Sequence, residues 1–233
     1  MKQGLMRGFY AVLWLMCVPS VWASTLGNIT HYQGSVKVYA KDAVRGKTVT
    51  QADYPLVAGD LVKTGRQALC VIVLADGSKM VLKGGTKLTI QAANRVHAES
   101  GRTVISFKKQ SSLKGLEVAT KSAIIGVKGT RFVVDYQQDQ VNVFLRNGQL
   151  DVRSLSGQFK RYRQKQRAEF DTFRQQMMGG FKQYKQQLHE EFVEYVEQFN
   201  MASGSAISIG NNEVRDLKIP VDIQAEFDWI DRF

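Results

Sequence analysis

The residue types that most often carry catalysis or bind metals are few in this chain and lie far apart. His31, His97 and His189 fall in different parts of the sequence, and Cys70 is the one cysteine after the first 23 residues. Zinc sites draw on closely spaced cysteines and histidines, and no such spacing occurs here. No Ser-His-Asp or Cys-His set is indicated, and no Walker-type glycine loop is present. The sequence therefore predicts no enzymatic activity, no cofactor and no metal.

Cys70 lies in the apolar run Ala68–Leu74. A reactive thiol needs a polar, electropositive setting, whereas a free cysteine among apolar residues usually packs as a small hydrophobic side chain. We expect a buried, inert thiol.

The first 23 residues have the pattern of a secretory signal peptide. Lys2 and Arg7 precede the apolar run Phe9–Val18, and Ala23 ends a small-residue cleavage motif. We expect cleavage after Ala23, export to the periplasm and no transmembrane span afterwards. An uncleaved membrane anchor is the alternative, although a spanning helix needs about 20 apolar residues.

The charge is strongly basic, with a formal net charge of +11. Residues 24–156 hold 19 lysines and arginines against 9 acidic residues. A basic exported domain can bind an anionic envelope polymer or a membrane surface, and export argues against nucleic acid as the partner. The alternative is that these charges only solvate the surface.

Residues 24–156 alternate apolar and polar residues in short runs that are typical of strands. The continuously apolar run at 69–74 predicts a core strand, followed by a hairpin at Asp76–Gly77. Asn147–Gly148 predicts another hairpin. The strands are predicted at residues 35–39, 69–74, 79–82, 87–90, 103–107, 116–120, 131–136, 141–145 and 149–152. Their spacing favours an all-β sandwich, roll or barrel-like fold.

Six segments follow one another along this region: Gly34–Val38, Leu56–Gly65, Val71–Ser78, Gly85–Leu88, Ala119–Val134 and Val141–Val152. In their residues and their order they resemble the FecR domain. The resemblance implies a compact β fold in the periplasm. Regulators of this family are similar to one another in spanning the inner membrane, with a cytoplasmic segment that controls a sigma factor. Only eight residues precede the apolar run here, so we expect a stand-alone exported protein that lacks this segment.

The motif residues of this region have a structural interpretation. We expect them at turns and bulges that need a positive φ or a bond from side chain to backbone, and a ligand-binding loop is the alternative. They are Asp60, Gly65, Asp76, Gly77, Gly126, Gly129 and Thr130.

Residues 157–202 contain four copies of an 11-residue unit with large apolar side chains at fixed positions. Their steps of 3, 4 and 4 average about 3.67 residues, so they predict one face of a long amphipathic α-helix. Gly179–Gly180 leaves open whether this helix is straight or a hairpin. The predicted interaction face comprises Phe159, Tyr162, Phe170, Phe173, Met177, Phe181, Tyr184, Leu188, Phe192, Tyr195 and Phe199.

An exposed face of this kind requires a covering surface. It could pack on the chain's own β domain, on a second copy in a coiled-coil-like pairing, or on another envelope component. Basic residues crowd the first repeat and acidic residues the last, which favours an antiparallel neighbour.

The tail, residues 203–233, is predicted to contain short strands at 206–209 and 217–223. Its acidic, aromatic end at 226–233 is expected to dock on the basic body. The sequence thus predicts a mainly β protein: a signal peptide at 1–23, a FecR-like β roll or sandwich at 24–156, a long helix at 157–202 and the tail. The predicted function is a non-enzymatic periplasmic scaffold or sensor that binds a protein of the cell envelope. Binding of an anionic envelope polymer or membrane surface through the basic β domain is the alternative.

Overall fold

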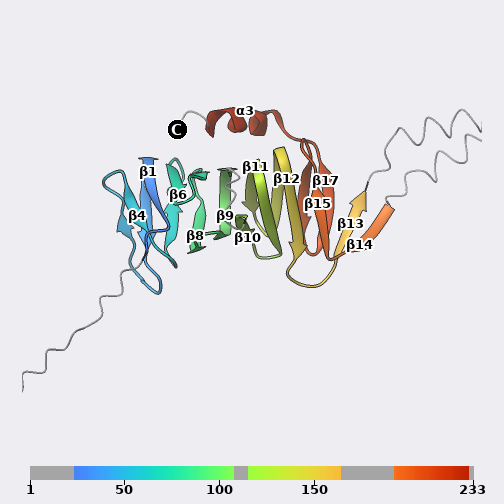
Figure 1. Cartoon of the computed structure of the whole chain (residues 1–233), viewed down its shortest axis with the longest axis horizontal. Coiled ribbons are helices and arrows are strands. Elements are labelled where there is room, and N and C mark those ends of the chain that lie inside the picture. The colour runs from blue at the N-terminus through green and yellow to red at the C-terminus, as the bar shows by residue number, and fades with distance from the viewer. Residues whose placement is uncertain (1–23, 108–114, 164–191, 231–233) are drawn as a thin grey trace, which may run out of the picture.

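The computed structural model describes residues 24–107, 115–163 and 192–230. In this part of the chain, 17 strands form one continuous sheet that folds over into two layers, and a helix lies along one side. The strands stand side by side along the long axis, from β4 (Tyr54–Leu56) and β1 (Gly27–Gln33) at one end to β13 (Phe159–Arg163) and β14 (Phe192–Val196) at the other (Figure 1).

We call the layer beneath the helix the helix-side layer and the other the far layer. The helix-side layer contains β1 (Gly27–Gln33), β4 (Tyr54–Leu56), β6 (Leu69–Leu74), β7 (Lys79–Leu82), β13 (Phe159–Arg163), β14 (Phe192–Val196), β16 (Ala206–Gly210) and β17 (Glu213–Leu217). The far layer contains β2 (Val36–Tyr39), β3 (Lys47–Thr48), β5 (Leu61–Thr64), β8 (Lys87–Ala92), β10 (Glu117–Ala119) and β15 (Gln198–Met201). Three long strands, β9 (Arg95–Ser106), β11 (Ala123–Gln137) and β12 (Gln140–Ser154), contribute one half to each layer.

The main core lies between the layers because alternate residues of each strand point inward. In β6, Cys70, Ile72 and Leu74 belong to this core, while Leu69 and Val71 belong to a second cluster under the helix. A strand that is buried on both faces reads as a continuous apolar run. The predictions of a mainly β fold and of a core strand at 69–74 are therefore confirmed.

The long strands β11 and β12 bend at the same place. Their register shifts between Lys128 and Arg131, next to Gly129 and opposite Gly148, whose φ angles are 63° and 93°. The predicted hairpin at Asn147–Gly148 is wrong, because β12 continues through these residues with a bend and without a chain reversal. The reversal between β11 and β12 uses residues 138 and 139 instead, which adopt φ of 53° and 111° without a glycine. The positive φ that Asn147–Gly148 predicted is present at Gly148, but it forms a bend in the strand instead of a hairpin turn.

The predicted continuous helix over residues 157–202 is wrong at both ends. Residues 159–163 and 192–201 form β13, β14 and β15, which pair with each other or with β12 and β17. In β15, Phe199 and Met201 are buried while Gln198 and Asn200 are exposed, a period of two instead of 3.6. Partners distant in sequence decided the structure here, and aromatic and β-branched residues accept a strand readily.

The predicted aromatic face is accordingly divided. Phe159 and Phe199 meet edge to face in the core, with ring centroids 6.0 Å apart. Tyr162 is half-buried and Tyr195 is 65% exposed, while Phe192 begins β14. Gly179–Gly180 lies outside the described residues. So do the other members of the predicted face, which are Phe170, Phe173, Met177, Phe181, Tyr184 and Leu188.

In the tail, the predicted strand at 206–209 is confirmed as β16, but the one at 217–223 is wrong. Strand β17 ends at Leu217, and α3 (Val221–Trp229) follows. Pro220 sits at the N-cap with φ −66°, where its fixed backbone and missing N–H suit a helix start. No helix among the described residues is long and apolar enough to cross a membrane.

Cys70 is fully buried, and burial raises the pKa of its thiol to about 12. The unfolded thiol ionises near pH 9 while the folded one does not, so this group should lower the stability of the native state progressively between about pH 9 and 12. We expect thiol reagents at pH 8 to modify Cys70 only in denaturant. Urea titrations of the wild type and Cys70→Ala from pH 7 to 11 should converge at high pH. Rapid labelling of the native protein would contradict the burial.

Candidate functional site

The outer face of the helix-side layer carries a row of apolar residues, one from each of six neighbouring strands. Direct pairing places each opposite the next across β6, β7, β9, β11, β12 and β16. The row, called here the apolar row, is Val71, Val81, Val104, Val133, Phe144 and Ala206, and all six are buried. Helix α3 crosses these strands on its way back from β17 toward β6 (Figure 1) and packs Ile223, Phe227 and Ile230 into the same cluster.

Charged side chains flank the apolar row and engage the acidic side of α3. Arg102 Nη1 donates to Glu226 Oε1 at 3.1 Å and to Asp222 Oδ2 at 3.3 Å. Lys83 Nζ lies 3.8 Å from the same Glu226 oxygen. On the other flank, Arg146 pairs with Asp228. The helix is therefore held by apolar contact beneath it and by opposite charge on both sides.

Arg102 is the centre of this arrangement. Its Nε and Nη2 donate to Asp135 Oδ2 at 3.1 and 2.8 Å, and Asp135 is directly opposite it on β11. Asp135 is only 4% exposed and also accepts a bond from Gln137 Nε2 at 3.0 Å. Burial disfavours the charge on Arg102, but the bonds and charges of Asp135 and Glu226 outweigh it and raise the pKa of Arg102. One guanidinium thus joins the sheet to the helix.

The C-terminal half of α3 has further cationic contacts. Arg131 Nη1 donates to the Phe227 carbonyl oxygen at 3.3 Å, and the Arg146 guanidinium lies 5.7 Å from the Phe227 ring centroid. Lys83 Nζ lies 3.9 Å from the centre of the Trp229 ring. Cations beside the carbonyl end of a helix and over aromatic rings are favourable placements.

A helix of nine residues has little stability in isolation. Its conformation therefore depends on docking, and the sheet surface beneath it is complementary to a short, acidic, amphipathic helix.

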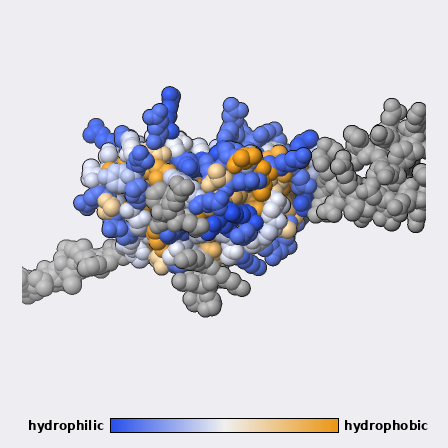
Figure 2. All heavy atoms as spheres, turned by 90° about the horizontal axis from the view of Figure 1, so that it is seen from above, coloured by the Kyte–Doolittle hydropathy of each residue, from blue (hydrophilic) through white to orange (hydrophobic). Residues whose placement is uncertain are grey.

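Most of the molecular surface on the side of α3 is hydrophilic, with smaller hydrophobic areas (Figure 2). The expectation that the acidic tail docks on the basic body is confirmed for the described residues 226–230.

Sequence reasoning did not single out the sheet residues of this site. Lys83, Arg102, Arg131, Asp135 and Arg146 look like ordinary surface charges, and only strand register brings them together. The one signal was the acidic, aromatic composition of the tail.

The motif residues between positions 57 and 78 lie in turns away from this site. Asp60 Oδ2 accepts the backbone N–H of Val57 at 2.9 Å, and Asp76 Oδ1 accepts that of Ser78 at 2.8 Å. Gly77 has φ 78°, whereas Gly65 is not among the glycines with positive φ.

The later motif residues lie in β11. Gly126 is at a regular strand position opposite Asp151, and Gly129 is at the bend. Thr130 is 3% exposed, and its carbonyl accepts the N–H of Phe107 at 2.9 Å. Among the described residues no group of three or more histidine, cysteine, aspartate or glutamate side chains could hold a metal ion.

Comparison with known proteins gives a family match and two distant structures. Residues 60–151 match the family model described as FecR protein. Two crystal structures of a candidate anti-sigma factor from Parabacteroides distasonis, at 2.50 and 1.65 Å resolution, are each 16% identical, with TM-scores of 0.46 and 0.47. Each alignment covers 73% of this chain but only 63% and 64% of those chains, less than two thirds of their length. No curated protein matches.

Proposed function

We propose that this chain, whose residues 60–151 match the FecR family model, is a non-enzymatic sensor or scaffold module of the periplasm that acts by binding another protein. FecR-type proteins are regulatory, and the leader-like first 23 residues support export. A mature N-terminus at Ser24 in the periplasmic fraction would test the location, and retention of the leader in membranes would contradict it.

The observation that carries the proposal is the surface under α3. An apolar row flanked by Lys83, Arg102 and Arg146 recognises an acidic amphipathic helix, the mode in which many regulatory grooves bind their targets. The partner we propose presents a helix of the same chemistry as α3. A tethered segment competes at an effective concentration of about millimolar, so α3 keeps the surface closed until it is displaced.

The anchor Phe227 provides the test. It is 1% exposed, so Phe227→Ala removes the largest apolar contact of α3 and should release the helix while the two-layer core stays folded. After leader removal Trp229 is the sole tryptophan, so its emission should shift to the red. Hydrogen exchange should accelerate at residues 221–230 and remain unchanged in β11 and β12.

In cells, a photo-crosslinking residue at position 83 should then capture a discrete second protein in the Phe227→Ala background. In the wild type it should form mainly crosslinks within the chain. Position 44, whose Val44 is 94% exposed on the β2–β3 connection, serves as the control. Internal products alone in both backgrounds, or equal capture at position 44, would refute the proposed partner surface. A product with the mass of two chains would identify exchange of α3 between copies as the partner mode.

A further inference from the structure

The outer face of the far layer carries a second ordered row, made of lysines. Direct pairing places Lys37 of β2 opposite Lys63 of β5, and Lys63 opposite Lys87 of β8. All three point away from the core, because their neighbours Val36, Val38, Val62 and Leu88 are buried between the layers. We call these three residues the lysine row.

Like charges directly opposite each other destabilise a sheet. Among the described residues, none of the three lysines forms an ion pair with a carboxylate. The row continues to Thr48 of β3 and Ser100 of β9, which are uncharged. The nearby Glu99 carboxylate accepts a bond from Thr89 Oγ1 at 3.0 Å. Within the described part of the chain, three adjacent positive charges are thus maintained without a paired carboxylate.

Protection of a sheet edge does not explain this arrangement. Lysines often occupy edge strands, where they prevent pairing with other chains. However, β2 is paired with β3 and β5, β5 with β2 and β8, and β8 with β5 and β9. None of the three is an edge strand, so the charge is better explained by a ligand.

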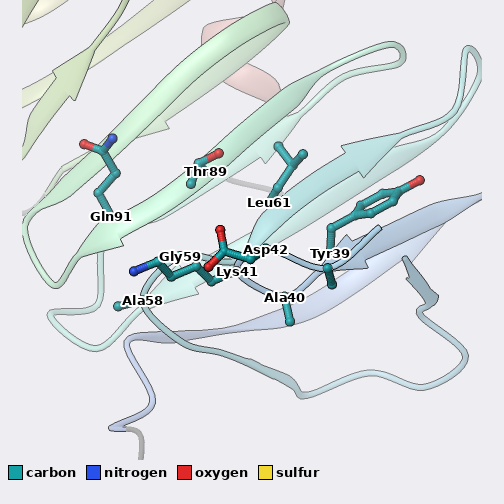
Figure 3. A pocket seen from close by; sticks show the side chains of 10 residues that line it. Tyr39, Ala40, Lys41, Asp42, Ala58, Gly59, Leu61, Thr89 and Gln91 are labelled. Carbon is teal, nitrogen blue, oxygen red and sulfur yellow. The ribbon is translucent and has the colours of Figure 1, made fainter. Parts of the chain in front are cut away.

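A shallow pocket adjoins the lysine row on the same face. Tyr39, Leu61 and Thr89 lie two residues further along the same three strands and are paired in the same way. They contribute to the lining of a pocket of about 550 Å³, which Lys41, Asp42 and Gln91 also border (Figure 3). An aromatic and an aliphatic side chain beside amide, hydroxyl, ammonium and carboxylate groups suit a ligand that is partly apolar and rich in hydroxyl groups, such as a sugar ring. The Asp42 carboxylate can accept hydrogen bonds from sugar hydroxyls, so the acidic groups of the ligand belong over the lysine row and not in the pocket.

We propose that this face binds an acidic polysaccharide that runs across β2, β5 and β8. Its acidic groups contact the ammonium groups of Lys37, Lys63 and Lys87, and a neighbouring sugar ring occupies the pocket over Tyr39 and Leu61. The ligand supplies the missing counter-charge, and strands spaced by about 4.8 Å favour an extended polymer over a single small anion. This inference is independent of the α3 surface, which lies on the opposite layer.

Binding to an anionic membrane is the competing explanation. Val44 is exposed next to Arg45 on the connection between β2 and β3, and an inserted apolar residue beside basic ones is a feature of membrane contacts. A single exposed apolar residue contributes little to membrane affinity, and the pocket has no role in membrane binding. The test separates the two explanations.

The experiment uses the full mature chain with alginate as the acidic polysaccharide, dextran as its neutral counterpart, and phosphatidylglycerol vesicles. The row variant is Lys37→Gln, Lys63→Gln and Lys87→Gln. The charge-matched control is Lys79→Gln, Lys121→Gln and Lys218→Gln, which removes three lysines outside the row. Leu61→Trp fills the pocket without changing any charge, and Val44→Ser removes the exposed apolar residue.

We expect alginate to bind the wild type at low salt and dextran not to bind. The row variant should bind alginate at least tenfold more weakly, the control within twofold of the wild type, and Leu61→Trp at least fivefold more weakly. Alginate should raise the melting temperature of the wild type but not of the row variant.

Three results would overturn the proposal. One is an equal loss in the row variant and its control, which would mean that only net charge matters. Another is unchanged alginate binding by Leu61→Trp, which would show that the pocket does not contribute to binding. The third is stronger binding to the vesicles that Val44→Ser abolishes, which would assign the face to a membrane. Melting temperatures without ligand identify any variant that fails to fold.

Discussion

Replacing Gly148 with alanine is expected to destabilise the native state by about 3 to 5 kcal/mol, among the largest effects of any single methyl group in this protein. Gly148 has φ 93°, which an L-residue with a side chain rarely adopts. A Cβ there would also lie 2.5 Å from the Gly129 carbonyl oxygen and 2.5 Å from Thr130 Cγ2. Both neighbours are fixed, because they form the bend at which β11 passes between the layers.

Urea denaturation monitored by circular dichroism measures this effect. Gly157→Ala is the matched control for backbone strain, since Gly157 has φ 99° but no atom within 4 Å of its Cβ position. Gly126→Ala is the control for a regular strand position, where the nearest contact would be an ordinary 3.6 Å. We expect about 1 kcal/mol for Gly157→Ala and little for Gly126→Ala. Equal losses at positions 148 and 157 would show that the close approach at the bend is unimportant.

The same position shows how far local sequence reasoning reaches. Asn147–Gly148 correctly signals a positive φ, but a positive φ serves a hairpin or a bend equally well. Which of the two forms depends on the strand opposite, and the register shift beside Gly129 accommodates a bend. The true turn at Gln138–Asp139 carries no glycine, so its sequence gives almost no turn signal.

The burial pattern of single strands was predictable, and pairing over long distances was not. The apolar run at 69–74 shows a doubly buried strand directly, because one layer covers each of its faces. By contrast, Phe159 and Phe199 follow a helical period in sequence but meet as strand residues in the core. Their partners β12 and β17 determine this outcome, and no periodicity within residues 157–202 contains that information.

The apolar row and the lysine row also depend on pairing between residues that are distant in sequence. Lys37, Lys63 and Lys87 are 24 or more positions apart in sequence, and the members of the apolar row are spread from Val71 to Ala206. Register alone aligns them, so composition could predict a basic domain and a docking tail but not the surfaces that they form. Asp60, Asp76 and Gly77 lie in turns and Gly129 lies at the bend of β11, so these motif residues and the candidate binding residues are different sets.

Replacing Arg102 with methionine is expected to destabilise the protein by about 2 to 4 kcal/mol and to release α3. Asp135 is 4% exposed and would keep only the bond from Gln137, so a buried carboxylate would lose its charged partner. The value is at the lower end for a broken buried pair, because the Arg102 side chain is 25% exposed. Glu226 and Asp222 would lose their bonds at the same time.

Urea titration gives the global loss, and Trp229 emission gives the docking of α3. Arg102→Lys keeps the charge but not the planar fork that bonds Asp135 and Glu226 together, so it should fall between the wild type and Arg102→Met. Asp135→Asn in the Arg102→Met background removes the stranded charge and should recover at least 1 kcal/mol. If the single and double variants were equally stable and Trp229 emission did not change, Arg102 would not be the residue that joins the sheet to the helix. The surface under α3 would then depend on the apolar row alone.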